Sequence, residues 1–124
     1  MGYRSDVAYI IKFKSFDDRE AFISLMLSKN DPNIYQAVNE TKHDYKEEPL
    51  ITFEADDVKW YPDFPDVQAH EQLYKDAHQY FEADYRFLAI GEDGTETFDE
   101  IDNNGFGLYD YIYAVHRLAT NFGE

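Results

Sequence analysis

The sequence predicts an α+β fold in a single domain, residues 1–124, with two helices packed on an antiparallel sheet. Alternating apolar residues mark extended segments, apolar residues at helical spacing mark two helices, and turn residues separate these elements. The predicted order is strand, helix, one or two strands, helix and three strands. This order fits a ferredoxin-like or split βαβ variant that ends in a three-stranded meander, because short right-handed connections suffice.

The first strand and the first helix are predicted between residues 6 and 29. Apolar residues alternate over 6–13, and one face carries Val7, Tyr9, Ile11 and Phe13. The other face is also largely apolar, so both faces of this strand are expected to be covered. Ser15 then supplies an N-cap for a helix that runs to about Lys29. Asp31 and Pro32 can open a short second helical turn.

A polar connection is predicted at 39–49, where no apolar period is present. The extended segment 50–61 follows it and changes phase, since odd-numbered apolar residues up to Ala55 give way to even-numbered ones around Trp60. A strict period of two would place Trp60 on the wrong face of the sheet. A bulge or tight turn at Asp56-Asp57 is therefore predicted, with either one bent strand or two short ones.

The second helix is predicted over 66–81, directly after Pro65, which suits the first turn of a helix. Its apolar stripe carries Val67, His70, Tyr74, Ala77 and Phe81. This stripe is predicted to pack on the sheet.

The C-terminal third is predicted to be the three-stranded meander. Its strands are 86–90, 95–101 and 108–115, and Asp93-Gly94 is a hairpin turn signal between the first two. Residues 117–124 are expected to be a C-terminal tail.

The charge balance is the main indication of partners. Asp and Glu number 26 against 11 Lys and Arg, which gives a net charge of −15, while 44% of the residues are hydrophobic. The hydrophobic share is that of a folded domain, so the charge is expected to surround an ordinary core. A field of this sign repels nucleic-acid backbones and anionic lipids, so neither direct nucleic-acid binding nor membrane binding is expected.

No motif in the sequence indicates catalysis, a metal or a cofactor. The chain has no cysteine, and His70-Glu71 does not complete a zinc-binding His-Glu-x-x-His pattern because Tyr74 occupies the second ligand position. His70 lies on the apolar stripe and is interpreted as a satisfied, half-buried histidine. The chain is therefore expected to be no enzyme and to use no cofactor. A small Asp/Glu/His-dependent hydrolase or metal-binding enzyme remains the alternative.

A cytoplasmic location is expected. Small exported domains commonly use disulfides, and no apolar run in the chain approaches the roughly 18 residues of a membrane span. The first residues also lack the apolar core of a signal peptide.

Two sets of residues are candidates for partner binding. The first is acidic and surrounds the predicted hairpin: Glu92, Asp93, Glu96, Asp99, Glu100 and Asp102. Carboxylates spaced along strands can imitate a row of phosphates, which is the physical basis of nucleic-acid mimicry. The second set shares one face of the last predicted strand: Tyr109, Tyr111 and Tyr113. Tyrosines of this kind can form a binding surface, and a homodimer through the sheet is a further possibility.

Two short segments, Met1–Val7 and Tyr85–Asp93, resemble small uncharacterised acidic proteins of tailed bacteriophages and prophages. The resemblance implies a setting in the host cytoplasm and an accessory role, without assigning any functional residue. Together with the charge, it leads to the expectation of a phage-type accessory protein that presents an acidic face to a basic host or defence protein, acting as an inhibitor or nucleic-acid mimic. A phage structural or assembly component is the other alternative.

Overall fold

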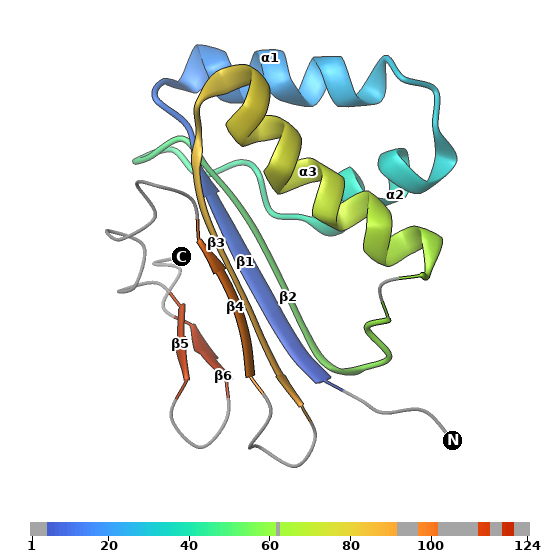
Figure 1. Cartoon of the computed structure of the whole chain (residues 1–124). Helices are drawn as coiled ribbons and strands as arrows, with labels where there is room; N and C mark the ends of the chain where they lie inside the picture. Colours follow the sequence, from blue (N-terminus) through green and yellow to red (C-terminus); the bar gives the residue numbers. More distant parts are fainter. Residues whose placement is uncertain (1–4, 62, 92–96, 102–111, 115–117, 121–124) are drawn as a thin grey trace.

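The computed structural model describes residues 5–61, 63–91, 97–101, 112–114 and 118–120 (Figure 1). Along the chain its elements are β1 (Ser5–Lys12), α1 (Phe16–Leu27), α2 (Pro32–Glu40), β2 (Leu50–Val58), α3 (Pro65–Phe81), β3 (Asp84–Gly91), β4 (Thr97–Ile101), β5 (Ile112–Ala114) and β6 (Leu118–Thr120).

The fold is α+β, as the sequence predicts. Strands β2, β1, β3 and β4 form one sheet in that order, and every neighbouring pair is antiparallel. β2 and β3 therefore run in the same direction on either side of β1, and α3 connects them, which makes a split βαβ unit. The complete ferredoxin-like topology is not confirmed.

In the part of the chain that the structure describes, three helices pack on the sheet in place of the two that the sequence predicts. α2 is the additional one, since Asp31 begins a helix of nine residues where only a short turn was expected. The Asp31 carboxylate accepts hydrogen bonds from the backbone N–H groups of Asn33 and Ile34, at 2.9 and 3.4 Å. α2 is stable because this cap is combined with burial of Ile34, Ala37 and Val38 in the core that α3 shares.

The predicted irregularity of the second strand is confirmed as a bulge in a single strand. Val58 pairs with Ser5 and Ala55 pairs with Val7, so β2 has one residue more than β1 at Asp56-Asp57. The extra residue reverses the alternation of side chains between the two faces for the residues that follow. The half-buried Trp60 packs against the main core.

The main core lies between the sheet and the helices. β1 contributes alternate residues that are fully buried, Val7, Tyr9 and Ile11. The helix predicted over 66–81 is confirmed as α3, which contributes the buried Tyr74 and Ala77, while Phe81 is partly buried against the same core. Val67 of the predicted stripe is also buried, but it lies outside this cluster.

A second, smaller core covers the opposite face of the sheet. Ala8 and Ile10 of β1 and Leu88 and Ile90 of β3 are buried there with Leu50 and Tyr45. Tyr45 lies in the connection predicted at 39–49, the first two residues of which belong to α2. The Tyr45 hydroxyl forms a 2.7 Å hydrogen bond with the Thr52 hydroxyl. The buried Arg19 holds the connection in place by donating from Nη1 to the Tyr45 carbonyl at 2.8 Å.

The predicted C-terminal meander is confirmed only in its first pair of strands. β3 and β4 are antiparallel neighbours. The predicted third strand, 108–115, requires a correction, because its described part is β5, which pairs with β6 in a separate two-stranded sheet. β6 itself lies within the predicted tail. β5 and β6 contact β1 and β3, and Figure 1 shows them on the side of the sheet away from the helices.

Candidate functional site

A buried histidine, His70, connects three elements in the main core. It lies on α3 with 2% of its surface exposed, so the prediction of a half-buried side chain is wrong. Its ring centroid is 4.2 Å from that of Phe53, 5.7 Å from that of Trp60 and 5.8 Å from that of Tyr9.

Both ring nitrogens of His70 form hydrogen bonds, as the interpretation of a satisfied histidine requires. Nδ1 lies 2.7 Å from the Tyr9 hydroxyl, and Nε2 lies 2.7 Å from Oε1 of Glu40. A carboxylate only accepts, so a neutral His70 donates from Nε2 to Glu40 and accepts from the Tyr9 hydroxyl at Nδ1. The Tyr9–His70–Glu40 network therefore links β1, α3 and the end of α2.

The surroundings keep Tyr9 and His70 in their uncharged forms. Burial raises the pKa of Tyr9 well above its ordinary value of 10.0, and Tyr74 and Glu40 act in the same direction. Burial also lowers the pKa of His70 from its ordinary value of 6.5, while the hydrogen bond and charge of Glu40 and the charge of Asp66 oppose this shift. The network is thus a neutral pair of side chains in contact with one carboxylate.

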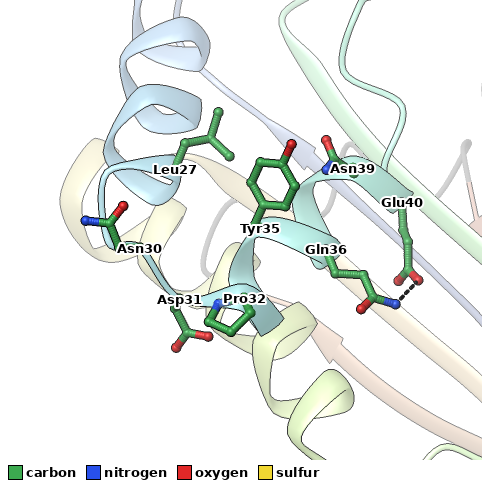
Figure 2. Close-up of a pocket in the computed structure, with 8 residues that line it drawn as sticks. All are labelled: Leu27, Asn30, Asp31, Pro32, Tyr35, Gln36, Asn39 and Glu40. Atoms are coloured by element: carbon green, nitrogen blue, oxygen red, sulfur yellow. Dashed lines mark hydrogen bonds between the residues drawn. The ribbon is translucent and has the colours of Figure 1, made fainter.

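Glu40 also belongs to an open pocket between the end of α1 and α2 (Figure 2). Its second oxygen, Oε2, accepts a 3.1 Å hydrogen bond from the side-chain amide of Gln36. Figure 2 shows the ring of Tyr35 in the middle of the pocket, with Leu27 on one side and Asn39 and Glu40 on the other. The pocket and the buried network therefore share one side chain.

Sequence reasoning did not identify Tyr9 or Glu40 as site residues. Tyr9 appears in the sequence as one of several alternating core residues, and Glu40 falls inside the predicted polar connection. The one available signal was His70, a titratable residue on an apolar stripe that must find partners when it is buried.

Most of the predicted binding residues lie outside the described residues: Glu92, Asp93, Glu96, Asp102, Tyr109 and Tyr111. The other three are described only in their backbone pairing. Asp99 pairs with Leu88 and Glu100 pairs with Phe87 in the β3–β4 ladder, and Tyr113 pairs with Ala119 between β5 and β6. The binding role of all nine stays a prediction.

Two further properties hold in the described part of the chain. None of its helices has the length and apolar character needed to cross a bilayer. Among the same residues, no group of three or more His, Asp and Glu side chains is placed to hold a metal ion.

Comparisons with protein-family models, with curated proteins and with solved structures find no match for this chain.

The network leads to a prediction of pH dependence. Because the pKa of His70 is lowered in the folded state, the unfolded chain takes up a proton below about pH 6.5 that the folded protein resists. The contribution of His70 to stability is therefore fully present above that pH and decreases as the pH falls through the folded-state pKa. His70→Gln is expected to weaken this loss between about pH 7 and pH 5, measured by urea unfolding.

The control is His78→Gln, a substitution of the half-buried histidine two turns further along α3. Since titrating carboxylates affect every variant in the same way, the comparison is the difference in free energy of unfolding between each variant and the parent at each pH. Equal pH dependence in the parent and in His70→Gln would contradict the assignment.

Proposed function

We propose that this protein is a small, non-enzymatic accessory protein that acts by binding, and that its acidic surface contacts a basic protein partner. The carboxylate surplus supports this proposal. With 26 acidic and 11 basic residues, ion pairing cannot remove a net charge of −15. An uncompensated field of this size attracts cationic surfaces and accelerates association with them.

Several lysines of the described region each offset the charge of one neighbouring carboxylate, and this leaves the surplus of 26 acidic over 11 basic residues in place. Lys12 is 2.9 Å from Glu48, Lys14 is 3.2 Å from Glu82, Lys42 is 3.2 Å from Asp44 and Lys75 is 3.7 Å from Glu71. Exposed pairs of this kind contribute little to stability. Repulsion among the carboxylates therefore lowers the stability of the folded state. This favours a role of the charge in recognition over a role in stabilising the fold.

The proposal also includes a role as an inhibitor or nucleic-acid mimic of a phage-type system, and a cytoplasmic location. The alternative, an Asp/Glu/His-dependent hydrolase, has less support. His70 is the histidine with an acidic partner at 2.7 Å among the described residues, but its 2% exposure leaves no room for a substrate beside it.

The experiment is a charge reversal at the predicted hairpin, Glu92→Lys, Asp93→Lys and Glu96→Lys together. Partners are first captured from a bacterial lysate at low salt, released at high salt and identified by mass spectrometry. The triple variant is expected to bind the captured basic partner at least about 10-fold more weakly, because each reversal replaces attraction by repulsion. Its thermal unfolding is expected to stay close to that of the parent.

The matched control reverses three exposed carboxylates elsewhere, Asp17→Lys, Glu47→Lys and Asp63→Lys, and so changes the net charge equally. A larger loss in the hairpin variant places the contact at the hairpin. If the hairpin variant binds as well as the parent does at physiological salt, the acidic hairpin is not the interface, and the tyrosine set becomes the next candidate.

A further inference from the structure

The pocket between α1 and α2 has an apolar surface that the described fold leaves exposed. Tyr35 is 59% exposed and Leu27 is 39% exposed, and both line the pocket together with Pro32. Large apolar side chains gathered at a hollow gain free energy when a second apolar surface covers them.

The charge of the same pocket is of one sign. Asp31 and Glu40 are its charged lining residues, and the remaining polar lining consists of the amides of Asn30, Gln36 and Asn39. Among the residues that the structure describes, no lysine, arginine or histidine lines it. An occupant that covers the apolar surface and complements the rim must therefore carry both apolar and cationic groups.

Glu40 is held in place at the end of this pocket. His70 donates to one carboxylate oxygen and Gln36 donates to the other, at 2.7 and 3.1 Å. The histidine is neutral, so these bonds orient the Glu40 carboxylate without cancelling its charge. A fixed carboxylate loses little side-chain entropy when it pairs with a cation, which makes it a better ion-pair partner than a freely rotating one.

We propose that this pocket receives a basic, amphipathic segment of a protein partner, with an apolar side chain between Leu27 and Tyr35 and a lysine or arginine at Glu40. The inference rests on the proposed function, for which it names the docking surface and the chemistry of the bound segment. Anchors of this type recur where amphipathic helices enter apolar grooves.

The probe for the test is an amidated 14-residue peptide of leucine and lysine arranged at helical spacing. Binding to the full chain is measured by calorimetry at low and physiological salt. Tyr35→Ala is expected to weaken binding about 10-fold and Glu40→Gln by about 3- to 10-fold, since one removes the apolar anchor and the other the charge. Peptides with all lysines replaced by glutamine, or all leucines by alanine, are expected to bind more weakly than the probe.

The chain offers a matched control for each variant. Tyr80 on α3 is 59% exposed, as Tyr35 is, and lies outside the pocket, so Tyr80→Ala is expected to leave binding unchanged. Glu71 is an exposed carboxylate on the same helix, so Glu71→Gln removes one charge elsewhere.

The outcomes separate this inference from the proposed function. Weaker binding in Tyr35→Ala and Glu40→Gln than in their controls supports the pocket. Equal binding by Tyr35→Ala and Tyr80→Ala overturns it, as does a parent chain that does not bind the probe at low salt. The proposed function is decided separately by the salt-dependent partner and the hairpin variant, so it can stand where the pocket fails.

Discussion

Tyr74→Asp is expected to lower the free energy of unfolding by at least about 4 kcal/mol, or to prevent folding altogether. Tyr74 is 2% exposed at the centre of the interface between α3 and the sheet. Its ring centroid lies 4.9 Å from that of Tyr85, 5.2 Å from that of Tyr9 and 5.6 Å from that of Phe87. The substitution removes these ring contacts and places a carboxylate among buried aromatic rings, where burial disfavours its charge.

The control is the same substitution six residues later on the same helix, Tyr80→Asp. Tyr80 is 59% exposed, so a new carboxylate there stays in water, and its effect is expected within about 1 kcal/mol. Both variants are compared with the parent by urea and thermal unfolding. Similar midpoints for Tyr74→Asp and the parent would mean that α3 does not pack through this face.

His70→Ala is expected to destabilise the protein by roughly 3 kcal/mol, from two sources. It opens a cavity among the rings of Phe53, Trp60 and Tyr9, and it removes the hydrogen-bond partner of the Tyr9 hydroxyl, which is fully buried. A buried hydroxyl that loses its partner costs more than a hydroxyl that is absent.

A double-mutant cycle with Tyr9→Phe separates these two sources. In the parent, Tyr9→Phe removes a 2.7 Å hydrogen bond and leaves Nδ1 of His70 without a donor, so it is expected to destabilise by about 1 to 2 kcal/mol. In the His70→Ala background the same change removes an unsatisfied hydroxyl, and it is expected to be neutral or stabilising. If the two substitutions are additive, the Tyr9–His70 hydrogen bond contributes no coupling energy.

The local elements follow closely from the sequence where one physical cause dominates. The stripe of Val67, Tyr74 and Ala77 predicts α3 because helical spacing and burial agree over its whole length. The bulge at Asp56-Asp57 was also predictable, since the period of two in a strand makes any change of phase visible in the sequence.

Other elements depended on contacts that local sequence does not contain. α2 is short and has polar residues on its exposed side. Its apolar positions stabilise a helix only when they are buried, and α3 is a packing partner that buries them. Tyr45 is a single aromatic residue in a polar segment, and it is buried because a second face of the sheet is there to receive it. The pairing of β5 with β6 likewise does not follow from local sequence, because strand propensity does not specify which neighbouring strand a segment pairs with.

The candidate site shows most clearly the difference between features that local sequence predicts and features that depend on tertiary contacts. The α+β class, the net charge of −15 and the position of a histidine on an apolar stripe follow from the sequence alone. Packing of the helices on the sheet is what brings Tyr9, His70 and Glu40 together through two 2.7 Å hydrogen bonds. Any two of these residues lie at least 30 positions apart along the chain. A carboxylate at the end of one helix can satisfy a histidine of another only after both helices have packed, because hydrogen-bond partners are set by distance in space and not by separation along the chain.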